Sequence, residues 1–138
     1  MDYEAFTQMM IADMRAHAGQ VTSGPMAGKP LMLLTSKGAK TGQDRTAIIT
    51  WSRDGDRYVI AASKSGAPEN PAWYHNLKAN PEATVEAGGE TFRVRATEAT
   101  GAERDRLWEQ HSEKLPEFLE YPKMTSRVIP MFFVDRIA

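Results

Sequence analysis

The segment from residue 36 to residue 45, SKGAKTGQDR, contains the first group of residues whose types suggest a chemical role. Its glycines allow backbone N–H groups to converge on an anion. Lys40 adds a positive charge, and Arg45 can offer a bidentate fork to a phosphate group. These features are typical of a phosphate-binding turn. An ordinary lysine-bearing hairpin explains the same residues, and it is the preferred interpretation while the segment is considered alone.

Charge is concentrated around this turn, although the whole chain of 138 residues has a formal net charge of only −1. The segment from Lys29 to Arg45 contains four cations (Lys29, Lys37, Lys40 and Arg45) and one anion, Asp44. A near-neutral protein lacks the basic surface that general nucleic-acid binding requires. The charge pattern therefore fits a local site for a small anion or a solvated loop, and no nucleic-acid partner is expected.

A second block of interest covers residues 62–81, where a Ser-Lys-Ser-Gly loop leads into a short helix that starts at a proline. On this helix Trp73 can form the wall of a pocket for a flat ring, and Asn76 can hydrogen-bond to such a ring. The alternative is that Trp73 and Leu77, one helical turn apart, only anchor the helix on the protein. That alternative is preferred from these residues alone.

Motifs for self-contained catalysis are absent from the sequence. The three histidines, His17, His75 and His111, match no zinc-ligand spacing, and the chain has no cysteine. The glycines near residue 40 lack the Gly-Lys-Ser/Thr of a P-loop, and neither a G-x-S-x-G nor a G-x-G-x-x-G motif occurs. We therefore expect no metal site, and an enzyme built from this chain would need a cofactor to carry the reaction.

Short strands joined by tight turns are the elements expected to position these two blocks. The apolar and β-branched pattern predicts about six of them, within residues 31–35, 45–51, 57–62, 83–87, 91–97 and 128–134. Helices are predicted for residues 2–18, 71–78 and 100–114. Hairpins rather than regular βαβ alternation predict a mainly β, α+β fold, a small barrel with helices over its openings. Residues 1–138 are expected to form one domain, with residues 1–29 as an N-terminal helix and connector.

Several local signals predict where these elements begin and turn. Asn70 is expected to cap the middle helix, with a proline in its first turn. Thr100 and Glu103 have the spacing of a capping box. The pair Gly88-Gly89 predicts a tight turn between two strands.

The predicted N-terminal helix has an apolar stripe of Tyr3, Phe6, Met10 and Met14, which Met9 and Ile11 widen. Such a stripe usually packs on the protein's own core, and the helix lacks the basic face that favours binding to a membrane surface. The chain has no apolar run of membrane-spanning length, and its acidic start does not resemble a signal peptide. These features favour a cytoplasmic protein, with weak peripheral contact at the inner face of the membrane as the alternative.

Taken together, TSKGAKTGQDR, AASKSGAPENPAWYHNLKANP, ATGAERDRLW and TSRVIP resemble the deazaflavin-dependent nitroreductase family. Members of this family are split β-barrel reductases that use coenzyme F420. The resemblance runs almost collinearly from about Pro30 to the end of the chain. It implies that the chain is an enzyme that transfers a hydride from the reduced deazaflavin to an electron-poor acceptor. Quinones, enones or unsaturated lactones and nitroaromatics are the acceptors that the family uses.

The resemblance also implies roles for individual residues. Lys40 and Arg45 would hold the phosphate and the acidic polyglutamyl tail of F420, and Thr41 and Gly42 would shape the loop around them. The residues expected to line the deazaflavin ring are Ala61, Ser63, Lys64, Trp73 and Asn76.

The acceptor pocket is expected to contain Leu115, Phe118 and Tyr121. Some family members carry several tyrosines in this region, whereas this chain keeps only Tyr121, so the pocket should be more apolar. The product's proton would come from solvent or from the hydroxyl of Ser63 or Tyr121. Asp44 stands where a proline is frequent in the family, and we expect its side chain to point outward.

Two alternative functions fit the same barrel. An FMN-binding split-barrel oxidoreductase would use a different flavin. The cations of residues 36–45 suit the acidic tail of F420, which disfavours FMN. A non-catalytic carrier of a hydrophobic ligand would use the same pocket without a cofactor. The partner is expected to be a small-molecule acceptor, and the chain is expected to be a monomer or a homodimer.

Overall fold

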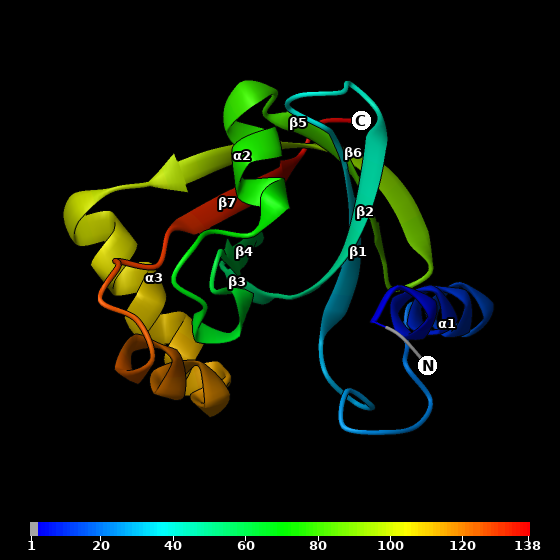
Figure 1. Ribbon diagram of the computed structural model, residues 1–138, viewed down its shortest axis with the longest axis horizontal. Helices are drawn as coiled ribbons and strands as arrows, with labels where there is room; N and C mark the ends of the chain where they lie inside the picture. Colours follow the sequence, from blue (N-terminus) through cyan, green and yellow to red (C-terminus); the bar gives the residue numbers. More distant parts are fainter. Residues whose placement is uncertain (1–2) are drawn as a thin grey trace.

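Seven antiparallel strands form one curled sheet in the computed structural model, which describes residues 3–138 (Figure 1). The strands are β1 (Leu31–Lys37), β2 (Asp44–Thr50), β3 (Ser52–Asp54), β4 (Arg57–Ala61), β5 (Glu82–Ala87), β6 (Glu90–Ala99) and β7 (Met131–Arg136). Their order in the sheet is β2-β1-β5-β6-β7-β4-β3. The prediction of a mainly β barrel with helices around it is therefore confirmed, with seven strands in place of about six.

The sheet curls because its two outermost strands are neighbours in sequence. Only Trp51 separates β2 from β3, yet these strands stand at opposite ends of the strand order. Two edges joined by a single residue must come together, which closes the sheet into a barrel-like shape. The segment that was predicted as one strand, residues 45–51, therefore ends at a bend, and the short β3 follows it.

Two hairpins, β1–β2 and β5–β6, have a well-defined register. In the hairpin of β1 and β2, Leu31 pairs with Thr50 and Lys37 pairs with Asp44, so the turn at residues 38–43 projects from one end of the sheet. In the hairpin of β5 and β6, the turn residues Gly88 and Gly89 both have positive φ, 59° and 82°. A two-residue turn of this kind matches the strand twist, so the Gly-Gly prediction is confirmed.

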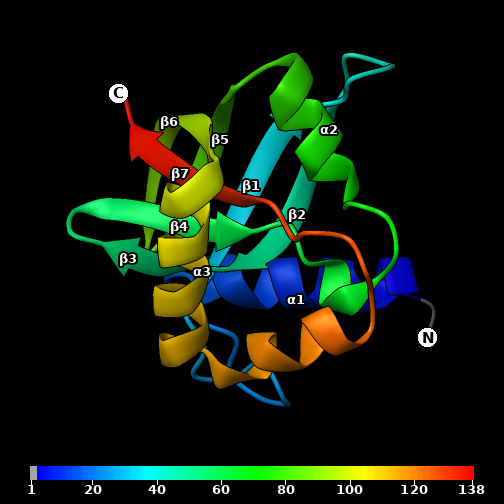
Figure 2. The same cartoon turned by 90° about the vertical axis from the view of Figure 1, so that its left-hand side faces the viewer.

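Helices cover the sheet from several sides. They are α1 (Tyr3–Ala16), α2 (Ala72–Ala79) and α3 (Gly101–Lys114), with two 3₁₀ segments, η1 (Lys64–Gly66) and η2 (Pro116–Lys123). Figure 1 shows α1 and α3 on opposite sides of the molecule, with α2 over one end of the barrel. Figure 2 shows α3 crossing the strands β3, β4 and β7, which it contacts.

Three clusters of buried side chains hold these layers together. Because successive residues of a strand point to opposite faces, Met32 and Leu34 of β1 enter the barrel core, whereas Leu31 and Leu33 face α1. The barrel core also includes Trp73 and Leu77 of α2. A second cluster joins α3 and η2 to the sheet through Ala61, Ala99, Leu107, Leu115, Phe118 and Phe133.

Three of the local expectations were wrong in detail. The buried face of α1 carries Ile11 and Met14, both in the predicted stripe, whereas Phe6 is 49% and Met9 57% exposed, so only part of the stripe packs on the core. Pro71 is the N-cap of α2, and the side chain of Asn70 accepts a hydrogen bond from Arg127 instead. The last strand begins at Met131, three residues after the predicted start.

The capping box predicted at the start of α3 does not form. Thr100 is the N-cap of this helix and has extended backbone geometry, but its side chain makes no capping hydrogen bond. The helix has the predicted extent to within one residue. Its buried Leu107 and His111 lie on one face, as their spacing indicates. Burial of this face therefore fixes the helix more than its cap does.

Candidate functional site

Two segments that are far apart in sequence, the β1–β2 turn and α2, meet through the side chain of Asn76. Its Oδ1 accepts a hydrogen bond from the backbone N–H of Ala39 at 2.9 Å. Its Nδ2 donates to the hydroxyl of Ser36 at 3.2 Å. Asn76 is only 6% exposed, and its bond to Ser36 is buried, whereas its bond to Ala39 is partly buried. The turn and the helix, which sequence reasoning expected to act together, are thus held side by side.

Bonds within the β1–β2 turn fix its shape. The N–H of Gly38 donates to the carbonyl of Gln43 at 2.7 Å, and the N–H of Gly42 donates to the carbonyl of Gly38 at 2.9 Å. Thr41 accepts a hydrogen bond from the N–H of Gln43 at 3.2 Å. Gly42 has φ +72°, which other residues rarely adopt. Thr41 and Gly42 therefore contribute to the fixed shape of the loop, and their role in cofactor binding stays a prediction.

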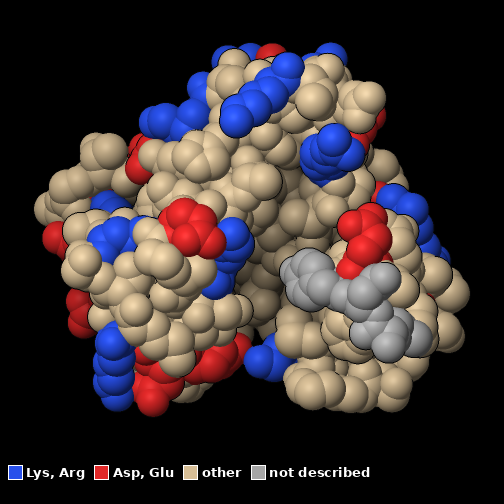
Figure 3. Space-filling view, in the orientation of Figure 1, with Lys and Arg blue, Asp and Glu red and all other residues tan. Residues whose placement is uncertain are grey.

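Lys40 on this turn and the flanking Lys37 and Arg45 have no partner among residues 3–138. The chain has 17 Lys and Arg residues, and within residues 3–138 every one except Lys37, Lys40 and Arg45 contacts a carboxylate, another oxygen acceptor or an aromatic ring. Asp44 lies beside Arg45 but is exposed and forms no ion pair within that range, as expected. Figure 3 shows Lys and Arg gathered at the end of the molecule formed by α2 and this turn. Unpaired cations in this position are available to an anion.

Figure 3 also shows a hollow on the same face, below α2 and between the part built by α3 and η2 and the part built by α1. The second core cluster brings Ala61 of β4 together with Leu115 and Phe118, and Tyr121 packs against it from η2. The rings of Phe118 and Tyr121 meet edge to face, with centroids 5.1 Å apart. The expected ring neighbour Ala61 and the expected acceptor-pocket residues therefore belong to one apolar cluster.

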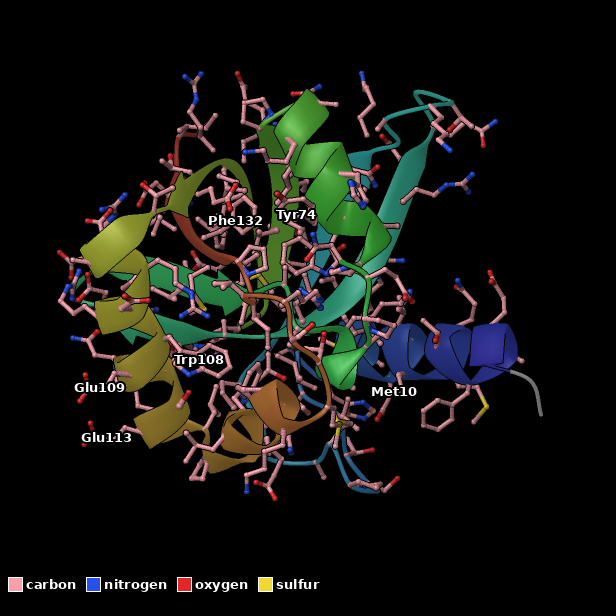
Figure 4. The ribbon with its side chains drawn as sticks, turned by 60° about the vertical axis from the view of Figure 1, so that its left-hand side comes forward. Met10, Tyr74, Trp108, Glu109, Glu113 and Phe132 are labelled. Carbon is pink, nitrogen blue, oxygen red and sulfur yellow. The ribbon has the colours of Figure 1, made fainter. Side chains whose placement is uncertain are left out.

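Trp73 lies in the barrel core rather than on an open surface. It is 9% exposed, and its ring meets Phe132 edge to face with centroids 5.8 Å apart. Tyr74, the next residue of α2, also contacts Phe132, as Figure 4 shows at the centre of the molecule. With Leu77 buried beside it, Trp73 has the anchoring contacts of the alternative interpretation.

The loop after β4 is fixed by an arginine to which sequence reasoning gave no role. Arg127 donates to the carbonyls of Ser63 and Ala67, at 2.9 and 3.0 Å, and to Asn70 Oδ1 at 2.6 Å. Lys64, whose φ is +46°, pairs with Glu69 at 2.8 Å. Arg127 lies in the TSRVIP segment, so its membership of a recognisable motif was the available signal.

A second residue without a predicted role is His111. It is fully buried, and its Nδ1 is 2.6 Å from the hydroxyl of Ser52. Its ring lies edge to face on Phe118 at 4.5 Å between centroids, which ties the pair to the apolar cluster. Burial lowers the pKa of His111 to about 4, so the side chain is neutral near pH 7.

A sequence model of the F420H(2)-dependent quinone reductase family matches residues 7–136. This chain belongs to that family. An F420H(2)-dependent quinone reductase of Mycobacterium tuberculosis is 44% identical over 110 residues, which cover 78% of this chain and 74% of that protein. The prediction of a deazaflavin-dependent oxidoreductase that uses coenzyme F420 is therefore confirmed.

Solved structures agree with the family assignment and with the fold. An F420-H2 dependent reductase, FDR-A, has a TM-score of 0.69 and 37% identity, covering 77% of this chain and 94% of its own. A protein described as a domain-swapped dimer has a TM-score of 0.71 and 32% identity. The match covers 95% of this chain and 99% of that protein's chain. HutZ of Vibrio cholerae, at 13% identity and a TM-score of 0.59, shares the fold alone. The split β-barrel prediction is confirmed.

For a quinone reductase of this family, the donor set of the site fits an elongated, anionic deazaflavin. Three unpaired cations lie on a turn of fixed shape, and an apolar cluster includes Ala61 and Phe118. Within residues 3–138, no group of three or more His, Cys, Asp or Glu side chains is arranged to hold a metal. No helix in the same range has the length and apolar character needed to span a membrane.

Proposed function

We propose that this chain reduces a quinone with the hydride of F420H2. The observation that carries the proposal is the set of three partnerless cations on a turn held against α2 by Asn76. Lys40 and Arg45 would bind the phosphate and the acidic tail of F420, with Lys37 adding to the same field. Every other cation within residues 3–138 already has a partner, which makes this turn the most favourable place for such a molecule.

The ring end of the cofactor would lie toward the loop after β4. Ala61 and Ser63 are buried at the end of that strand, and Lys64 begins η1. When bound, F420H2 would supply a hydride and release one proton, which leaves oxidised F420. The quinone would gain that hydride and one proton and leave as a hydroquinone.

The residues of this chain would position the acceptor and keep water away. Leu115 and Phe118 present buried apolar surface to a flat ring. The hydroxyls of Ser63 and Tyr121 form no hydrogen bond within residues 3–138, so either can donate the proton, as can solvent. Asn76 and Trp73 would act indirectly, by holding the turn and α2 in place.

Binding and turnover of the purified chain test the proposal. Titration with F420 should change the cofactor's fluorescence, and anaerobic mixing of F420H2 with 2-methyl-1,4-naphthoquinone should produce F420 and hydroquinone in equal amounts. A chain that neither binds F420 nor oxidises F420H2 would refute it. A yellow preparation that releases FMN on denaturation would identify the FMN alternative. Co-purified lipid without cofactor affinity would identify a carrier.

We also propose that the chain forms a homodimer through α1. A structural neighbour with 32% identity is described as a domain-swapped dimer. In this chain α1 packs on β1 through a separate cluster and leaves Phe6 49% and Met9 57% exposed. Size-exclusion chromatography with light scattering should give twice the chain mass, and replacing Phe6 and Met9 by serine should give the monomer mass. A wild-type monomer at every concentration would refute this.

Contact of α1 with the inner face of a membrane stays a prediction. The same exposed Phe6 and Met9 would face the lipid. Co-sedimentation with anionic vesicles tests it, and the serine variants should then remain in the supernatant.

A further inference from the structure

A cavity of about 390 Å³ lies where β3 begins and α3 ends. It is lined by Pro30, Trp51, Ser52, Arg53, Lys114 and Leu115. Its volume is within the range of small-molecule sites, which are mostly apolar with a few polar groups. Leu115 also belongs to the apolar cluster that we assign to the acceptor, so the cavity adjoins the proposed acceptor pocket.

Two cations at this cavity have no carboxylate partner. Lys114 donates to the backbone carbonyl of Arg53 at 2.6 Å. The guanidinium of Arg53 donates to the hydroxyl of Tyr58 at 3.2 Å and lies over the rings of Trp51 and Tyr58, at 5.5 and 4.7 Å. These contacts fix the two cations in position, and neither forms an ion pair with a carboxylate within residues 3–138, although the charge of Lys114 helps to lower the pKa of Asp54.

Nearby acidic groups are engaged elsewhere or point away. Asp54 accepts two hydrogen bonds from Arg106, at 3.0 and 3.1 Å. Glu117 pairs with Lys29 at 3.1 Å. Figure 4 shows Glu109 and Glu113 of α3 pointing outward into solvent. The cavity therefore combines apolar walls with a net positive rim.

Two residues that line the cavity, Ser52 and Trp51, carry buried polar groups. Ser52 is held by the bond between its hydroxyl and His111, and this buried imidazole is neutral near pH 7, so it adds no charge. The indole Nε1 of Trp51 is buried and has no partner within residues 3–138. An apolar site with fixed cations on one side favours a flat ring that carries one negative charge.

We infer that this cavity binds an anionic substituent of the acceptor, so that the enzyme prefers quinones bearing a sulfonate or carboxylate beside the ring. The inference rests on the proposed function for its assignment to the acceptor. The walls formed by Trp51 and Leu115 contact the ring, and Arg53 and Lys114 bind the anion. A neutral quinone of the same size lacks the second set of contacts.

A binding experiment without cofactor tests the cavity itself. Naphthalene-2-sulfonate and naphthalene-2-sulfonamide have nearly the same shape but differ in charge at pH 7. In ¹H–¹⁵N spectra, the sulfonate should shift the indole N–H signal of Trp51, assigned by its loss in Trp51→Phe. It should bind about tenfold more tightly than the sulfonamide, because two exposed charge pairs are gained.

Variants then separate charge from packing. The double variant Arg53→Gln with Lys114→Gln should make the two compounds bind equally. The matched double variant Lys78→Gln with Arg95→Gln, which removes two cations on other surfaces, should keep the tenfold preference. Equal binding of both compounds to the wild type, or a signal change confined to Trp73 and Trp108, would overturn the inference.

Steady-state kinetics extend the test to the reaction. With F420H2 as donor, the KM for 1,4-naphthoquinone-2-sulfonate should be about tenfold below that for 1,4-naphthoquinone in the wild type. The Arg53→Gln, Lys114→Gln variant should lose this ratio while the kcat for the neutral quinone stays the same. If the chain reduces neither quinone, the proposed function fails, whereas the sulfonate titration still decides whether the cavity binds an anion.

Discussion

Removing the two predicted phosphate ligands, by Lys40→Ala together with Arg45→Ala, should weaken F420 binding by about 30-fold. A hydrogen bond to a charged group contributes about 1.5–3 kcal/mol. Both side chains are exposed, and screening by water and salt lowers the contribution of each to about 1 kcal/mol. The sum of about 2 kcal/mol corresponds to roughly a 30-fold rise in Kd.

The stability of the double variant should hardly change, which separates this loss from misfolding. Neither side chain has a hydrogen-bond or ion-pair partner within residues 3–138, so truncation breaks no native contact. The free energy of unfolding should stay within about 0.5 kcal/mol of the wild type in urea titrations. Each single variant should lose about half of the binding free energy that the double variant loses, because Lys40 and Arg45 would contact different parts of an elongated anion.

Fluorescence titrations with F420 at low and high salt provide the assay. The wild-type Kd should rise steeply with salt, and the Kd of the double variant should rise less, because fewer ionic contacts remain to be screened. The control is Arg15→Ala with Arg95→Ala, which removes the same charge from α1 and β6, away from the turn and α2. A Kd for Lys40→Ala, Arg45→Ala within twofold of the wild type would show that the turn does not bind the cofactor.

Three further predictions concern residues that support the site. Burial holds the pKa of His111 at about 4 against about 6.5 when unfolded, so the folded state resists protonation. Stability should therefore fall as pH drops from about 6.5 toward 4, by about 2 kcal/mol at pH 5, and urea titrations of His111→Gln should lack this component. Asn76→Leu leaves the N–H of Ala39 without its partner, so urea titration should show a loss of about 2 kcal/mol in the free energy of unfolding. F420 titration of the same variant should show weaker binding, even though the cations remain. Trp73→Ala creates a core cavity and should cost about 3–5 kcal/mol in the same denaturation assay, and an unchanged midpoint would contradict its burial.

The strands were predictable because their signals are local. Alternation of buried and exposed residues in β6 and the Gly-Gly turn before it depend on neighbours in sequence. The buried face of α1 was predictable only in part, because the apolar stripe is wide and packing against β1 decides which of its residues are covered. Ile11 and Met14 are buried, whereas Phe6 is exposed. The bend at Trp51 likewise follows from closing the sheet, which no local pattern contains.

The site was predictable in its composition but not in its contacts. The cations of residues 36–45 were visible in the sequence, whereas their lack of partners depends on where every carboxylate lies in three dimensions. The bond between Ser52 and His111 joins residues 59 positions apart. Asn70 resembled a helix cap, but Arg127, 57 positions away, takes its side-chain oxygen. Such long-range partners are chosen by the fold, so local propensity cannot reveal them.

The bend between β2 and β3 means that the proposed cofactor site and the proposed acceptor site lie at the two ends of one strand, β2. Asp44 and Thr50 mark the ends of β2, and six steps of about 3.3 Å separate them by roughly 20 Å. Mutations more than about 10 Å apart usually have additive effects. If the two proposed sites are correct, the choice of acceptor should respond to changes at residues 51–53, and deazaflavin affinity should respond separately to changes at residues 40–45. A mutant library that varies one end should leave the other unaffected, which makes this strand a convenient starting point for redesign.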